Sequence, residues 1–143
     1  LPDTSRMRRF IKPKNLAAPI RRLLHRFWPG PLTAVLRASK LGSMISGLPT
    51  IGIRVPNHPL ALSILRQCPA PVVATSANLS KGKEPVHARN IPLSLKKAAK
   101  CVVTEPGKTN LAQPSTVLDI SSWPPRILRH GALTKRQLKK WLR

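Results

Sequence analysis

Acidic residues are almost absent from this chain. Its 143 residues include four acids (Asp3, Glu84, Glu105 and Asp119) against 26 lysines and arginines, which gives a formal net charge of +22. Such a chain is expected to bind polyanions, RNA or DNA among them, through counterion release. The alternative interpretation is a solvated basic surface from a source with biased composition, and charge alone does not separate the two.

Cysteine, aromatic residues and long apolar runs are also scarce. The chain has no Tyr, two Phe and three Trp. Its two cysteines, Cys68 and Cys101, lie far apart among apolar neighbours, which predicts buried reduced thiols and an intracellular, cytoplasmic protein. No run approaches the length of a membrane span and no signal-peptide pattern opens the sequence, so no membrane partner is expected.

Several common catalytic patterns are missing as well. The sequence has neither a Gly-x-x-x-x-Gly-Lys-Ser/Thr loop nor a Gly-x-Gly-x-x-Gly fingerprint. Its His, Cys, Asp and Glu residues show no metal-site spacing, and no Ser-His-Asp set can be assembled. Any catalysis is therefore expected to work through positioning and positive electrostatics.

Apolar periodicity predicts one α/β domain over residues 1–143, with a mixed sheet and flanking helices. The predicted strands are Leu32–Leu36, Thr50–Val55, Pro71–Thr75, Cys101–Thr104, Ser115–Ile120 and Arg126–Leu128. The predicted helices are Leu16–Trp28, His58–Gln67, Pro92–Ala99 and Thr134–Leu142. Loops are expected at Arg37–Pro49 and Ser76–Asn90.

The most informative segment is Ser76-Ala77-Asn78, directly after the apolar run Pro71-Val72-Val73. A β-branched run that gives way to small hydroxyl and amide residues is typical of a buried strand that ends in an exposed loop. Ligands of open α/β sheets collect at such carboxyl ends of strands. Ser and Asn also make ordinary turns, so this segment is weak on its own.

Arg54 stands in a predicted strand that is otherwise suited to burial. A guanidinium at such a position needs a partner, because an unpaired buried charge is costly. With so few acids in the chain, a bound carboxylate or phosphate is the favoured partner. His58, four residues later, is expected to start or pack a helix rather than to act as a catalyst.

Two further segments offer polar groups. Ser115 and Thr116 begin a predicted strand, and Arg129 ends another beside Gly131. Two strand-borne arginines with hydroxyl and amide groups favour a pocket for a small anion, such as a nucleotide with an amino acid. The rigid turn Trp28-Pro29-Gly30-Pro31 is expected to be scaffold.

Taken together, five segments in order resemble the YrdC-like domain of threonylcarbamoyl-AMP synthases. They are Trp28-Pro29-Gly30-Pro31-Leu32-Thr33, Ile53-Arg54-Val55-Pro56-Asn57-His58-Pro59, Ala74-Thr75-Ser76-Ala77-Asn78-Leu79-Ser80, Pro114-Ser115-Thr116-Val117 and Ile127-Leu128-Arg129-His130-Gly131. The resemblance implies a twisted mixed sheet that lacks the family's N-terminal part, because the Pro-Thr-Asp-Thr-x-Tyr-Gly-Leu-like and Lys-x-Arg segments of the family are not found. It also shows Lys81 as an extra residue before Gly82.

The activity that this resemblance implies is the synthesis of threonylcarbamoyl-adenylate from L-threonine, bicarbonate and ATP with Mg²⁺. The product serves the threonylcarbamoyladenosine modification of tRNA, so the implied partners are double-stranded RNA or tRNA and the threonylcarbamoyl-transfer machinery. The resemblance assigns Arg54, Ala74 and Ser115 to threonine. It assigns to the nucleotide Thr50, Ser76, Asn78 and Arg129.

Two other readings remain open at this stage. The first is a catalytically inactive, basic RNA-binding module of the same fold. The second is a carbamoyl-transfer protein of hydrogenase maturation, although such proteins carry zinc-finger cysteines that this sequence lacks.

Overall fold

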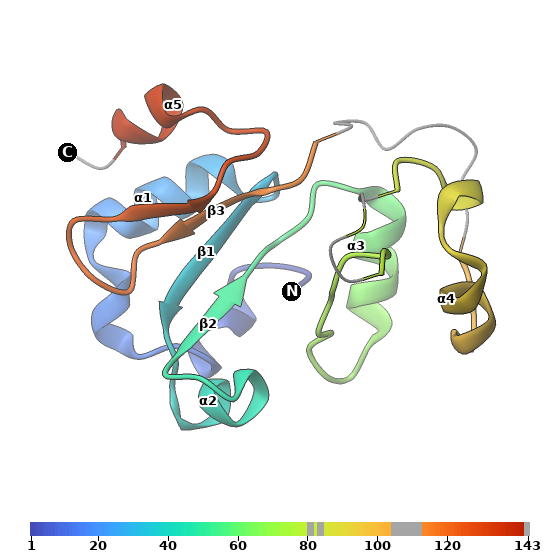
Figure 1. The fold of residues 1–143 in the computed structure, drawn as a ribbon. Helices are drawn as coiled ribbons and strands as arrows, with labels where there is room; N and C mark the ends of the chain where they lie inside the picture. The colour runs from blue at the N-terminus through green and yellow to red at the C-terminus, as the bar shows by residue number, and fades with distance from the viewer. Residues whose placement is uncertain (80–81, 83–84, 104–112, 142–143) are drawn as a thin grey trace. The chain divides into compact units, whose positions relative to one another are not determined.

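A four-stranded mixed sheet organises most of the chain in this computed structural model, which describes residues 1–79, 82, 85–103 and 113–141 (Figure 1). The strand order is β2–β1–β3–β4. β1 and β3 run parallel, whereas β1–β2 and β3–β4 are antiparallel pairs. The strands are β1 (Leu32–Arg37), β2 (Thr50–Ile53), β3 (Thr116–Asp119) and β4 (Arg126–Arg129). The predicted α/β class and these four strands are confirmed.

The chain divides into two compact units. The first comprises Leu1–Val72 and Ser115–Arg143 and holds the sheet, whereas the second comprises Val73–Pro114. Helices of the first unit are α1 (Ala18–Phe27), α2 (Lys40–Ser46), α3 (Pro59–Gln67) and α5 (Lys135–Lys139), and the second unit holds α4 (Leu93–Ala98).

One face of the sheet carries the core of the first unit. Alternate residues of β1, namely Leu32, Ala34 and Leu36, are fully buried, as the period of a strand requires. The amphipathic helix α1 packs Leu23 and Leu24 into the same cluster. This packing fixes the position of β1, to which both neighbouring strands are paired.

The turn between α1 and β1 is rigid scaffold, as expected. The Trp28 indole Nε1 donates to the Leu32 carbonyl at 2.7 Å, and Gly30 N donates to the Val55 carbonyl at 2.8 Å. A Cβ on Gly30 would overlap the carbonyl oxygen of Phe27. The turn is therefore tied both to the start of β1 and to the residues that follow β2.

Helix α2 corrects the loop expected over Arg37–Pro49. The Ser39 side chain accepts a hydrogen bond from Gly42 N at 3.1 Å, and Gly47 ends the helix at a φ of +69°. An N-cap serine and a glycine at a positive φ are strong helix boundaries. The short apolar pattern between them did not reveal the helix, because Gly42 lowers helix propensity.

Two predicted strands are wrong. Residues 71–75 and 101–103 form no strand, while Thr104 lies outside the described residues. The side chain of Val73 is 72% exposed. A strand needs a hydrogen-bonded neighbour. Within the described residues, the sheet consists of β1 to β4, and neither of these two segments pairs with it. Apolar β-branched composition alone cannot supply that neighbour.

The two cysteines differ from expectation in their exposure. Both cysteines are free thiols, but Cys101 is exposed and Cys68 is half-buried, so the predicted burial of both is wrong. Cys101 is exposed because its segment joins no sheet. Among the described residues, no helix combines the length and the apolar character needed to cross a membrane.

Gly42→Ala should destabilise the first unit by about 1–3 kcal/mol, because the new Cβ would overlap the carbonyl oxygen of Phe10. Chemical denaturation of both variants against the parent measures this. The matched control is Gly52→Ala in β2, where a Cβ would meet its nearest atom, Thr33 Cγ2, at 3.6 Å. A Gly42→Ala chain as stable as Gly52→Ala would contradict the packing of α2 described here.

Candidate functional site

Three of the predicted site residues lie at one edge of the sheet. β1 and β3 begin at this edge, and the antiparallel strands β2 and β4 end there. Arg54 follows the last residue of β2, Ser115 precedes the first residue of β3, and Arg129 ends β4. The sheet topology therefore gathers the two arginines and the serine that are distant in sequence.

Arg129 is oriented by Ser115. Its Nε and Nη2 atoms donate to the Ser115 carbonyl at 3.2 and 3.0 Å, and Nη2 also contacts Ser115 Oγ at 3.1 Å. The Ser115 hydroxyl in turn forms a hydrogen bond of 2.8 Å with the hydroxyl of Thr33, which lies on the neighbouring strand β1. A guanidinium held in this way presents its charge in a fixed direction.

The Arg54 guanidinium is half-buried, and its Nε donates to the Gly30 carbonyl at 3.1 Å. Burial, and then the charge of Arg129, lower the pKa of Arg54 from its ordinary value. Among the described residues, no carboxylate lies within ion-pair distance of this side chain. A half-buried guanidinium with a second guanidinium nearby forms a binding position for an anion.

The start of β3 is fixed by a buried hydroxyl. Thr116 Oγ1 donates to the Leu133 carbonyl and accepts from the Leu133 amide, both at 2.9 Å. This pair of bonds holds the segment after β4 against the start of β3. The expectation that the Thr116 hydroxyl lies at a pocket rim is wrong, because Thr116 is fully buried and supports the strand instead. Sequence reasoning also missed Thr33 and Gly30. The outward position of Thr33 in an alternating strand was the available signal.

Thr50 does not join this group. It begins β2 and is paired with Arg37, the last residue of β1, so it stands at the opposite end of β2 from Arg54. Four residues of strand separate the two positions by roughly 13 Å. A role for Thr50 remains a prediction.

The remaining predicted site residues, Ala74, Ser76 and Asn78, belong to the second unit. Asn78 Nδ2 donates to the carbonyls of Leu79 at 3.0 Å and Gly82 at 2.7 Å, so its amide braces the loop. Ala74 and Ser76 are exposed. The roles assigned to these three residues remain predictions.

His58 behaves as expected and caps a helix. Its Nδ1 accepts from the Ala61 amide at 3.4 Å at the start of α3. Within the described ranges, no three His, Cys, Asp or Glu side chains come together as a metal site. The groups at this edge of the sheet therefore suit an anionic ligand that is held by arginines and hydroxyls.

Comparisons with known proteins identify the family of this chain. The family model Sua5/YciO/YrdC, described as telomere recombination, matches residues 1–131. A threonylcarbamoyl-AMP synthase of Pyrococcus abyssi is 34% identical over 129 residues, which cover 89% of this chain and 38% of that protein. A threonylcarbamoyl-AMP synthase of Bacillus subtilis is 38% identical over 120 residues, covering 82% of this chain and 34% of that protein.

A solved structure carries the same fold. The crystal structure of P. abyssi Sua5 complexed with L-threonine has a TM-score of 0.88 and 32% identity, covering 97% of this chain and 41% of that chain. The present chain thus spans between a third and two fifths of the length of the curated relatives described above.

Phosphate should stabilise this chain more than chloride at equal ionic strength, because an anion between Arg54 and Arg129 relieves their repulsion. At phosphate well above its dissociation constant, the thermal midpoint is expected to rise by on the order of 5 °C. Arg54→Met should lose most of that rise in a thermal melt followed by circular dichroism.

The control for this melt is Arg126→Met. Arg126 lies at the other end of β4, and its side chain is 72% exposed, so the variant removes the same charge away from the site. Equal losses in the two variants would mean that phosphate acts on the overall charge and not at this edge.

Proposed function

Because this chain belongs to the Sua5/YciO/YrdC family, we propose that it forms the substrate-binding part of a threonylcarbamoyl-AMP synthase. The activity is that of a nucleotidyltransferase that makes threonylcarbamoyl-adenylate from L-threonine, bicarbonate and ATP for tRNA modification. The observation that carries the proposal is the half-buried Arg54, which lies close to Arg129 and pairs with no described carboxylate.

Arg54 is assigned to the carboxylate of L-threonine. A guanidinium matches a carboxylate through two parallel N–H···O bonds, which fixes the orientation of the amino acid as well as its position. Ser115 supplies a hydroxyl beside the same edge, and Ala74 is assigned to threonine through its backbone. Support comes from the solved relative, whose description names L-threonine as its ligand.

Arg129 is assigned to the nucleotide, together with Thr50, Ser76 and Asn78. A fixed guanidinium stabilises the charge that develops on a phosphate during transfer. The contacts of Arg129 with Ser115 fix the orientation of its guanidinium before the reaction.

The reaction proceeds in two steps. The amine of threonine adds to bicarbonate with loss of water and gives N-carboxy-threonine. One oxygen of the new carboxylate then attacks the α-phosphorus of ATP, the bond to the β-phosphate bridging oxygen breaks, and pyrophosphate leaves. The residues of this chain contribute binding, orientation and positive charge, in keeping with the few acids available as general bases.

Mg²⁺ belongs to this reaction as a companion of ATP. Magnesium in such sites is held by substrate phosphate oxygens with one or two carboxylates. The described residues offer no group of three metal-ligating side chains, so they do not fit a resident metal. Magnesium is therefore assigned to the incoming nucleotide.

The cellular setting follows from the product. Threonylcarbamoyl-adenylate is used by the machinery that modifies tRNA, so the proposal includes a cytoplasmic location with tRNA and that machinery as partners.

The net charge of +22 favours a second candidate function, a basic RNA-binding module without catalytic activity.

A pyrophosphate-release assay separates the two functions. Release from ATP should require both L-threonine and bicarbonate, and Arg54→Lys should reduce kcat/KM by about 100-fold, because an ammonium cannot hold a carboxylate through two parallel bonds. Arg126→Lys, on the exposed part of β4, should leave the rate unchanged.

If the chain does not turn over ATP, calorimetry of L-threonine binding still tests the role assigned to Arg54. L-Threonine should bind the parent chain and not the Arg54→Lys variant. A chain that binds RNA with a steep salt dependence but neither releases pyrophosphate nor binds threonine would be the inactive module.

A further inference from the structure

A hollow lies at the edge of the sheet opposite Arg54, where β1 and β3 end. Its volume is about 630 Å³, within the range of small-ligand sites. It lies wholly within the first unit and is lined by Lys12, Lys14, Ile20, Arg37, Ile120, Ser121, Ser122 and Trp123. None of the residues assigned above to threonine or the nucleotide lines it.

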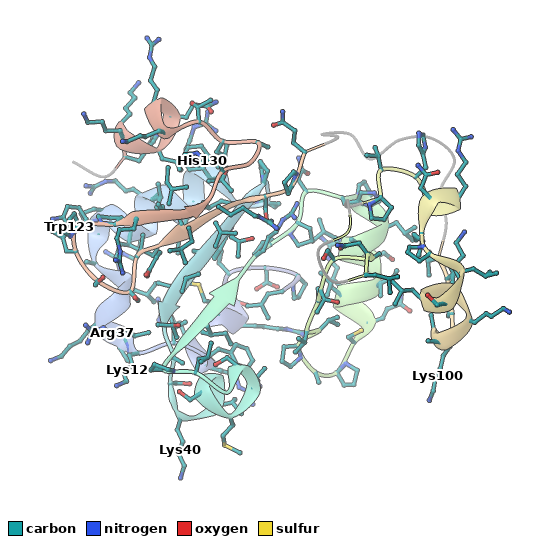
Figure 2. The ribbon with its side chains drawn as sticks, viewed as in Figure 1. Lys12, Arg37, Lys40, Lys100, Trp123 and His130 are labelled. Carbon is teal, nitrogen blue, oxygen red and sulfur yellow. The ribbon has the colours of Figure 1, made fainter. Side chains whose placement is uncertain are left out.

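Trp123 is the most unusual member of this lining. Its side chain is 66% exposed, whereas that of Trp28 is 6% exposed. Aromatic residues are rare in this chain, and a large aromatic ring left in water beside a hollow is a surface on which a flat ring can stack. Figure 2 shows Trp123, Arg37 and Lys12 along the same side of the first unit.

The charges around this ring all have one sign. Lys12, Lys14 and Arg37 are the charged side chains of the lining. Arg37 is held in place because its Nε donates to the Ser121 carbonyl at 2.8 Å. The hollow therefore combines an aromatic surface with three cations, one of which is oriented by the segment that carries the ring.

The described acid of this region, Asp119, makes its own contacts within the β3–β4 connection. Asp119 accepts from the amide and the hydroxyl of Ser121 at 2.9 and 2.7 Å, and its other oxygen lies 3.9 Å from Arg126 Nη2. Asp119 is thus engaged within the β3–β4 connection, where it shapes the segment that leads to Trp123.

We propose that this hollow binds single-stranded nucleic acid, with one unpaired base stacked on Trp123 and the flanking phosphates on Lys12, Lys14 and Arg37. Basic grooves that present aromatic rings bind single strands through stacking together with backbone charge. A duplex cannot use this ring, because its base faces are covered by neighbouring bases. The proposal is independent of the synthase function, since no residue assigned to threonine or the nucleotide lines the hollow.

The test compares two ligands of equal charge. A labelled short oligouridine and an abasic oligomer of the same length are titrated into the full chain at physiological salt. The parent chain should bind the base-carrying oligomer about tenfold more tightly, which is the contribution of one stacked base. Trp123→Leu should bring this ratio close to one and leave the affinity for the abasic oligomer unchanged, whereas Trp123→Phe should keep part of the preference.

Matched charge variants separate this hollow from the overall charge. Lys12→Ser/Lys14→Ser should weaken both oligomers and reduce the slope of log K against log salt by about 1.4, since each lysine neutralises one phosphate. Lys135→Ser/Lys139→Ser removes the same charge from α5 and should change the slope less.

Three results would overturn the proposal. They are an unchanged base preference in Trp123→Leu, equal losses in the two double-lysine variants, and a duplex that binds as tightly as the single strand with the same dependence on Trp123. An oligothymidine of the same length distinguishes DNA from RNA as the source of the strand. Circular dichroism of each variant confirms that the exposed position tolerates the change.

Discussion

The half-buried guanidinium of Arg54 is the constraint on which the candidate site depends. Burial and the charge of Arg129 both act against it, and the described residues supply only the Gly30 carbonyl as a compensating partner. Such an arrangement lowers stability in the unliganded protein and is retained where a ligand completes it. Under the proposed function, a ligand with a carboxylate and a phosphate engages both guanidinium groups at once.

Sheet topology turns this local feature into a site. The parallel pair β1–β3 places two strand starts side by side, and the antiparallel partners β2 and β4 return to the same edge with their last residues. Arg54 and Arg129 therefore meet across two intervening strands, with Thr33 and Ser115 between them. The opposite ends of the same strands carry Arg37 and the β3–β4 connection, where the basic hollow lies. One small sheet thus presents positive charge in two different chemical settings.

Part of the fold and of the candidate site could be predicted from the sequence alone. β1 was predictable because alternation and the flanking Pro31 agree. Arg54 was expected inside the strand Thr50–Val55, whereas β2 ends at Ile53 and Arg54 lies just beyond it. The runs at Pro71–Thr75 and Cys101–Thr104 have the same composition as true strands. Strand formation there depends on a distant neighbour, which no local pattern reveals. Helix α2 was missed because Gly42 lowers the helix propensity of its segment. That glycine is required because the Phe10 carbonyl approaches it closely.

The central claim is that Arg54 holds the carboxylate of an amino-acid substrate, and the arginine Nε–Hε resonances report on it directly. During a titration with L-threonine, the Arg54 signal should shift and saturate, while that of Arg126 at the exposed end of β4 stays in place. A titration that moves Arg126 and other surface arginines but leaves Arg54 unchanged would contradict the account.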